Sequence, residues 1–464
     1  MKKIILILVL NNILFFGFSQ KIILKEKEEP APLKNKNVLQ NEANFSQLAT
    51  ENFRLNRTIK NQFKRNDTYP VLQLKPSRTI ELEFFYNNFK NLDSVRYSVS
   101  YPELNSSNVK GKTIVNTKME ELNATQRDIL ETFIKTLLAD FKPRIENISK
   151  YKLRGYFSER KVVKTKDELT KYLNGLDKNA TKLNLSNYGL REIPIEAFTF
   201  KNLTLLDLSE NKIKNLKISK KQFPKLERII LTGNVLNEKT FKVSRNKKLK
   251  VINLMDNDFE AIPKSIRKAK NLEEILLANN AIQSVNKFKS NKNLKILNLY
   301  QNDISEFKPK YGRLKKLEIL DLYHNNIKFL DKDISKLENL KILALAYNSL
   351  WNMPEEIKML KNLEELYVHH NKLQDIPILP TSLRHLDLGY NLFESINEHV
   401  FLLNNLQELD ISNNALTAVP VKIKQLNNLK TAYITPNIFE SEEHKLSELE
   451  QLIVDLEKKS IKVK

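Results

Sequence analysis

The sequence predicts an α/β fold: a solenoid of about twelve units whose short strands form one curved parallel sheet, with a small α+β domain before it and a capping helix after it. The main observation is an apolar pattern, LxxLxLxxNxL, that recurs along most of the chain. A second recurring phrase, such as MPEEIKMLKNL, supplies a turn and a short helical return, so each unit gives one strand and one return. The asparagine of the pattern returns almost every 23 residues, at Asn211, Asn234, Asn257, Asn280, Asn302, Asn325, Asn348, Asn371, Asn391, Asn414 and Asn437.

The N-terminus has the pattern of a secretory signal peptide over residues 1–19. Two lysines precede an apolar run from 4 to 16, and the small residues Gly17 and Ser19 suit a cleavage site. The alternative is an uncleaved membrane anchor, for which the run is short. Residues 20–65 are charged and interrupted by prolines, which is typical of a flexible spacer.

Composition excludes several kinds of chemistry. The 464-residue chain has no cysteine, which rules out disulfides, thiol nucleophiles and zinc–thiolate sites within it. It has only eight scattered glycines, and no histidine precedes His324, so neither a phosphate-binding loop nor an early imidazole base is present. The formal charge of +22 is typical of proteins that bind polyanions, unless the lysines are simply spread over solvated surfaces.

Residues 66–160 predict the small α+β domain. The segments TIELEF, at 79–84, and SVRYSVSY, at 94–101, alternate apolar and polar residues and are interpreted as strands. The segment 123–141 has apolar residues at helical spacing behind the potential cap Asn123. We assign no family to this domain.

Both ends of the solenoid need covers, because a bare terminal unit exposes its core. Residues 161–180 predict an N-terminal cap helix with Leu169, Tyr172 and Leu173 on its apolar side. Residues 441–464 predict a C-terminal cap helix, for which a partner-binding helix is the alternative. Its apolar face is expected to comprise Leu446, Leu449, Ile453 and Leu456.

From about residue 181 to 440 the chain resembles the leucine-rich repeat family across twelve units. The resemblance implies that the leucines fill a shared core, that the asparagines form a hydrogen-bonded ladder, and that the protein recognises other proteins without catalysis. Within the family, the chain resembles exported bacterial members, including internalin-like proteins. Ubiquitin-ligase relatives use a cysteine that this chain lacks.

In this family the residues one, two, four and six positions before the asparagine line a concave surface, and we expect the partner-binding site there. Acidic residues outnumber basic ones at these positions, where Arg228 is the one clearly basic residue. The alternative is that some of these positions are aromatic by chance. The predicted site comprises Tyr300, Asp321, Tyr323, His324, Tyr347, Glu365, Tyr367, His369, His370, His385, Asp387 and Tyr390.

We therefore predict a secreted or cell-envelope scaffold, bacterial in type, that binds a protein or peptide and needs no cofactor. An acidic lining opposes nucleic acid, while the outer lysines are suited to weak contact with envelope polyanions. The alternative is an envelope glycan-binding protein, although Trp351 is the single tryptophan. Three imidazoles, His369, His370 and His385, leave metal binding or a pH response between about 5 and 7 open as well.

Overall fold

The computed structural model describes residue 55, the strand segments 79–87, 91–109, 112–120 and 150–158, and residues 166–463 except 245, 286, 287, 289, 309–313 and 442. The predicted signal peptide, the spacer apart from Leu55, and the helix predicted over 123–141 lie outside these residues. No helix in the described part of the chain is long and apolar enough to cross a membrane.

The N-terminal strands form a separate four-stranded antiparallel sheet in the order β3-β2-β1-β4. Both strands that the sequence predicts are present, as β1 (Thr79–Asn87) and β2 (Asn91–Val109). The sequence reasoning missed β3 (Lys112–Glu120) and β4 (Lys150–Ser158). The assignment of residues 66–160 to one α+β domain stays a prediction.

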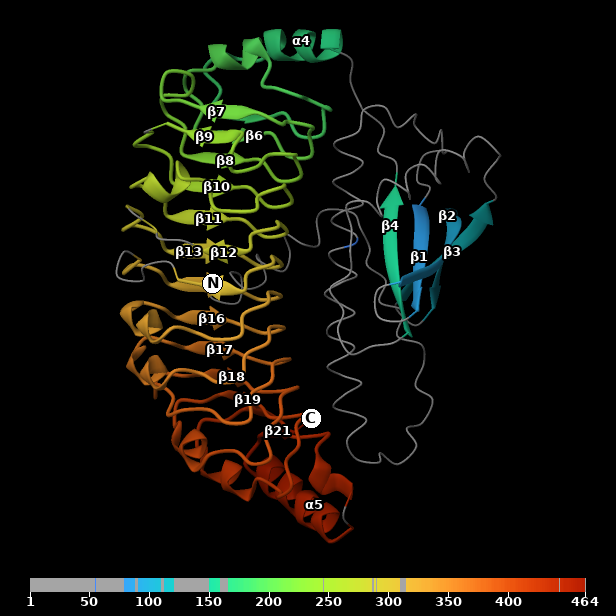
Figure 1. Ribbon diagram of the computed structural model, residues 1–464, viewed down its shortest axis with the longest axis vertical. Coiled ribbons are helices and arrows are strands. Elements are labelled where there is room, and N and C mark those ends of the chain that lie inside the picture. The colour runs from blue at the N-terminus through green and yellow to red at the C-terminus, as the bar shows by residue number, and fades with distance from the viewer. Residues whose placement is uncertain are drawn as a thin grey trace. The chain divides into compact units, whose positions relative to one another are not determined.

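The repeats fold into a leucine-rich repeat solenoid with one parallel sheet of 13 strands. Figure 1 shows these strands stacked in a column. Twelve of them belong to the twelve predicted units, and the last is a short addition that pairs with β20 near the C-terminus. The strands are β5 (Lys182–Asn184), β6 (Leu205–Asp207), β8 (Arg228–Ile230), β10 (Val251–Asn253), β11 (Glu274–Leu276), β13 (Ile296–Asn298), β15 (Ile319–Asp321), β16 (Ile342–Ala344), β17 (Glu365–Tyr367), β18 (His385–Asp387), β19 (Glu408–Asp410), β20 (Thr431–Tyr433) and β21 (Lys462–Val463).

The returns are mostly 3₁₀ segments on the opposite side of the core from the sheet. Two pairs of short strands add small parallel sheets there: β7 (Leu216–Ile218) with β9 (Phe241–Val243), and β12 (Ser284–Val285) with β14 (Glu306–Phe307). The unit between Asn371 and Asn391 has no 3₁₀ segment, as its two prolines predict. The 3₁₀ segments are η1 (Ile195–Thr199), η2 (Ile266–Lys268), η4 (Lys332–Lys336), η5 (Glu355–Met359), η6 (Glu398–Leu402), η7 (Val421–Gln425) and η8 (Ile438–Ser441).

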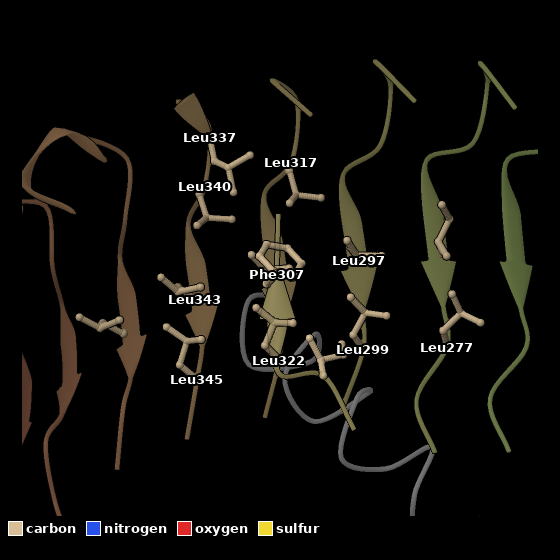
Figure 2. Close-up of a cluster of buried hydrophobic side chains, with 14 of the residues drawn as sticks. Leu277, Leu297, Leu299, Phe307, Leu317, Leu322, Leu337, Leu340, Leu343 and Leu345 are labelled. Atoms are coloured by element: carbon tan, nitrogen blue, oxygen red, sulfur yellow. The ribbon is translucent and has the colours of Figure 1, made fainter. Parts of the chain in front are cut away.

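A continuous leucine core fills the space between the sheet and the returns. Each strand points its central residue inward: Leu320 of β15 is fully buried, while Ile319 and Asp321 on either side of it keep partial exposure. This alternation follows from the two-residue period of a strand. Figure 2 shows Leu297, Leu299 and their neighbours from successive units meeting in one apolar layer. No unit can bury these side chains alone, so the core exists only in the stack.

The predicted asparagine ladder is present. In Asn325, Oδ1 accepts a hydrogen bond of 3.0 Å from the backbone N–H of Ile304 in the preceding unit. Its Nδ2 donates to the carbonyls of Leu299 and Leu322, each at 3.0 Å. The same contacts recur along the stack, and they satisfy buried backbone groups that would otherwise have no partner. We call these residues the ladder asparagines.

Two helices cover the ends of the stack (Figure 1). In α4 (Lys166–Gly175), Leu169 and Leu173 are buried in the core, as predicted. In α5 (Glu443–Lys458), the prediction was partly wrong, because Leu452 is buried together with Leu449 and Leu456, whereas Leu446 is 39% exposed. The buried stripe lies where the helix meets η7, η8 and β21, and Leu446, in the first turn, is only partly covered.

Replacing Asn325 by alanine is expected to lower the free energy of unfolding by about 2–4 kcal/mol, because several buried backbone groups lose their partner at once. Chemical denaturation followed by circular dichroism measures this change. Asn326→Ala, at the adjacent half-buried position, is the control and should cost much less. Equal effects of the two substitutions would show that the ladder contributes no special stability.

Candidate functional site

The predicted site residues lie together on the side of the 13-stranded sheet that faces away from the leucine core. We call this side, with the positions one, two, four and six residues before each ladder asparagine, the sheet face. The twelve residues come from five consecutive strands of this sheet, β13, β15, β16, β17 and β18, and the turns that follow them. Eleven of them keep some exposure. His324 is only 7% exposed because neighbouring rings cover it, and its role as a contact residue stays a prediction.

The residue before each ladder asparagine from Asn211 to Asn414 has a left-handed backbone conformation, which sequence reasoning missed. Its φ is 54° at His324, 52° at Tyr347, 53° at both His370 and Tyr390, and similar in the other units that carry a ladder asparagine up to Asn413. Glycine takes this conformation freely, as Gly233 does, but for other residues it costs about 1–2 kcal/mol. The turn after every strand imposes the same geometry, so the side chains at this position leave the sheet in the same direction.

This shared direction stacks four rings, which we call the ring ladder. The centroids of Tyr347 and His370 are 3.9 Å apart with the planes 11° from parallel, and those of His370 and Tyr390 are 3.9 Å apart at 17°. His324 continues the series at 4.3 Å from Tyr347. Adjacent strands lie about 4.8 Å apart, so equivalent rings on neighbouring units are held close to stacking distance.

A second group of rings lies two positions before the ladder asparagines, where one unit has a small side chain in place of a ring. Tyr300 and Tyr323 lie 5.6 Å apart on adjacent units. In the next unit the equivalent position is Ala346, and the Tyr323 hydroxyl reaches past it to lie 3.3 Å from Nε2 of His369, two units away. A small residue at 346 therefore permits a contact between residues 46 positions apart.

Carboxylates and imidazoles alternate on the strands that follow. Nδ1 of His369 lies 2.8 Å from Oδ2 of Asp387, at ion-pair distance although the N–H is not aligned for a hydrogen bond. Nδ1 of His385 lies 3.2 Å from Oε2 of Glu408. Sequence reasoning omitted Glu408 from the site, as it did Asp410, although both hold sheet-face positions before Asn414 and could have been found by that spacing.

Tyr367 joins this alternating group from β17. Its hydroxyl donates to Oε2 of Glu365 at 2.9 Å. Its ring centroid lies 4.6 Å from that of His385 on the adjacent strand. Glu365 and His385 are register partners, and so are Tyr367 and Asp387.

Burial controls the ionisation of the rings and of one carboxyl group. It lowers the pKa of His324 and of His370 to about 3, with a smaller contribution from nearby His369, so both rings are neutral near pH 7. Burial also raises the pKa values of the tyrosine hydroxyls at 300, 323, 347 and 367. It raises the pKa of Asp321 to about 7, although the backbone N–H of Tyr323 opposes this shift by donating to the carboxylate.

The described residues contain no group of three or more histidine, aspartate or glutamate side chains placed to hold a metal ion. The three imidazoles considered from the sequence are used differently. His369 and His385 each face a carboxylate, whereas His370 is stacked between Tyr347 and Tyr390.

Acidification is expected to destabilise the solenoid partly through His370. Its pKa is lower in the folded chain than the unperturbed value near 6.5, so the unfolded chain binds more protons and stability falls as the pH drops from about 6.5 toward 3. His370→Phe keeps a ring between its neighbours but cannot be protonated. The loss of unfolding free energy between pH 7 and pH 4 should then shrink by about 1–2 kcal/mol, less than the full shift because the ring is partly exposed.

Denaturation at a series of pH values measures this effect. His444→Phe, which changes an exposed histidine of α5, is the control and should leave the pH dependence of wild type. If the stability of His370→Phe had the same pH dependence as that of wild type, His370 would not contribute to the loss of stability in acid.

Comparison with solved structures finds other repeat solenoids. A leucine-rich repeat protein of Leptospira interrogans is 24% identical, with 64% of this chain and 98% of that chain covered and a TM-score of 0.43. An internalin of Listeria monocytogenes is 17% identical, with 64% and 93% covered and a TM-score of 0.46. A chain of the Toll–Spätzle complex of Drosophila is 20% identical, with 55% and 37% covered and a TM-score of 0.48. No curated protein matches this chain by sequence.

The family comparison agrees with the structure. The leucine rich repeat family model matches residues 178–236, 315–373 and 381–437. All three ranges lie in the part of the chain where strands, leucine core and ladder asparagines repeat. With that solenoid and these matches, the repeats of this chain are leucine-rich repeats.

Proposed function

We propose that this protein is a scaffold that binds a protein or peptide through the sheet face, which we infer to be the concave side of the solenoid. The aromatic rings of the sheet face carry the proposal, those of the ring ladder and those of Tyr300, Tyr323 and Tyr367 beside it, and the ring ladder is the most ordered part. Its rings are fixed by stacking and by the backbone before binding, so little side-chain freedom is lost when a partner docks. Tyrosine also combines a large apolar surface with a polar hydroxyl, which suits protein contacts.

The chemistry of the face supports binding better than catalysis. A general base works best with a pKa near the working pH, yet the pKa values of His324 and His370 are lowered to about 3. The pKa of Asp321 is near 7, but its two oxygens accept hydrogen bonds from the backbone N–H of Tyr323 and the amide of Asn298. These contacts give the carboxylate a structural role. Leucine-rich repeat scaffolds are in general not enzymes, and we propose the same for this chain.

We further propose that the protein acts outside the cytoplasm, in the envelope or secreted from a bacterial cell. The support is the signal-peptide pattern at residues 1–19. The lysine-rich surface outside the sheet face would contact envelope polyanions weakly, since exposed charges are screened by salt.

Glycan binding is a second candidate, and one observation favours it. Phe329 and Trp351 are 57% and 56% exposed, and their ring centroids lie 5.5 Å apart. This pair stands outside the sheet face, and sequence reasoning did not foresee its exposure. Exposed aromatic rings suit stacking on sugars as well as on protein side chains.

Capture of a partner by the immobilised full-length chain tests the proposed function. A captured protein, identified and then purified, should bind Tyr323→Ala/Tyr367→Ala at least about tenfold more weakly, because central aromatic contacts each contribute about 1–2 kcal/mol or more. The control is Met359→Ala/Leu402→Ala, two exposed residues on the returns.

Thermal melting monitors the fold of both variants. Binding that is insensitive to the tyrosine pair would overturn the role of the sheet face. Glycan-array signals that are lost only in Phe329→Ala/Trp351→Ala would favour the second candidate.

A further inference from the structure

Four carboxylates gather on three adjacent strands of the sheet face. Glu365, His385 and Glu408 are register partners across β17, β18 and β19, and Tyr367, Asp387 and Asp410 form the parallel row. All six keep partial exposure. Within the described residues, the cationic groups of lysine and arginine form no ion pair with these four carboxylates. Asp387 and Glu408 each lie at ion-pair distance from an imidazole instead.

Carboxylates that immediately precede the strands of the same sheet are neutralised differently, by lysine side chains. The residue before each strand alternates in charge over eight units: Glu227, Lys250, Glu273, Lys295, Glu318, Lys341, Glu364 and Arg384. Lysines pair with glutamates of the preceding unit, as Lys295 does with Glu273 at 3.0 Å and Lys341 with Glu318 at 2.6 Å. In a chain of formal charge +22, basic side chains are thus abundant beside the sheet but not on this part of its face.

The scaffold does not need the negative charge of Asp387 and Asp410. In each, Oδ1 accepts a hydrogen bond from the backbone N–H two residues later, at 3.1 Å from Gly389 and 2.9 Å from Ser412. Asparagine does this equally well in other units, as Asn253 does for Met255 at 3.0 Å. Aspartate therefore adds a second, anionic oxygen that the turn itself does not use.

The two aspartates are also close to each other. A Cβ placed on Gly389 would lie 3.0 Å from Oδ1 of Asp410 and 3.4 Å from Oδ1 of Asp387, so both carboxylates border the same backbone position. Burial and, next, the charge of Asp387 raise the pKa of Asp410. Like charges held together in this way are relieved by a cation.

We infer that the sheet face over β17–β19 binds guanidinium or ammonium groups of a basic segment of the partner, and that His369 and His385 release it when they are protonated. This inference rests on the proposed function and specifies its partner. Four ionised carboxylates give this part of the face a formal charge of −4 while both imidazoles are neutral. Two imidazolium groups would reduce it to −2 and would occupy Asp387 and Glu408 with internal ion pairs, which compete with the partner.

The surroundings of the two histidines fit this exchange. The groups near His385 are the Tyr367 ring, the Glu408 carboxylate and Glu365, its register partner on β17. His369 is flanked from four other units. The groups that face it or interact with its charge are Tyr323, His324, Tyr347, His370, Asp387 and Asp410. The phenols and His370 stay neutral near pH 7, so the carboxylates dominate the charge at both imidazoles.

A labelled hexa-arginine peptide is the probe, and fluorescence anisotropy with the full-length chain is the measurement. At near-physiological salt and about pH 7.5 the peptide should bind, although the positive net charge of the chain would by itself repel a basic peptide. Asp387→Asn/Asp410→Asn keeps the Oδ1 acceptors and should weaken binding about tenfold or more. Glu355→Gln/Glu356→Gln in η5 makes the same charge change on a return and should leave binding unchanged.

The pH response is tested with the same probe. At about pH 5.5 wild type should bind several-fold more weakly than at pH 7.5, whereas His369→Gln/His385→Gln should bind equally at both. A peptide that does not bind, or binds the aspartate variant as well as wild type, overturns the basic partner. If peptide binding by the histidine variant weakens between pH 7.5 and pH 5.5 as much as binding by wild type, the release mechanism is overturned. Either failure leaves the proposed function standing if a captured protein still depends on Tyr323 and Tyr367.

Discussion

The buried asparagine amide fixes one unit of this solenoid against the next, and every other feature depends on that register. Each ladder asparagine satisfies backbone groups in its own unit and in the unit before it, as Asn325 does for Leu322, Leu299 and Ile304. A shift of one residue would leave these groups buried without partners and would also turn the leucines out of the core. Polar satisfaction and apolar packing therefore require the same register.

The constant register produces a recognition surface because the turns of successive units share one backbone conformation. Side chains at equivalent positions are therefore aligned. The left-handed residue before each ladder asparagine up to Asn414 costs energy wherever it is not glycine, and bulky rings occupy this position in four successive units. The leucine core and the asparagine ladder offset that cost. In return the rings of His324, Tyr347, His370 and Tyr390 are aligned with little freedom to move, which is the property that a rigid binding surface needs.

Charge is distributed over the solenoid according to position within the unit. At the start of the strands, lysines and glutamates alternate and neutralise each other across units. On the face over β17–β19, carboxylates are opposed by imidazoles instead. Net charge alone would have suggested an anionic partner, whereas the local lining of the face favours a cationic one. Electrostatic selection depends on the groups that a partner touches, because exposed charges farther away are screened.

The sequence by itself determined the repeat, its twelve units, the inward leucines, the asparagine ladder and the positions that form the sheet face, because all of these follow from periodic spacing. Spacing carries no information about contacts between units that differ in one side chain. Only the tertiary structure decided that Tyr323 reaches His369 past Ala346, that neighbouring rings bury His324, and that Leu452 rather than Leu446 packs against the last unit. These outcomes depend on which side chains the stacked backbone brings within reach, and packing rather than periodicity settles that.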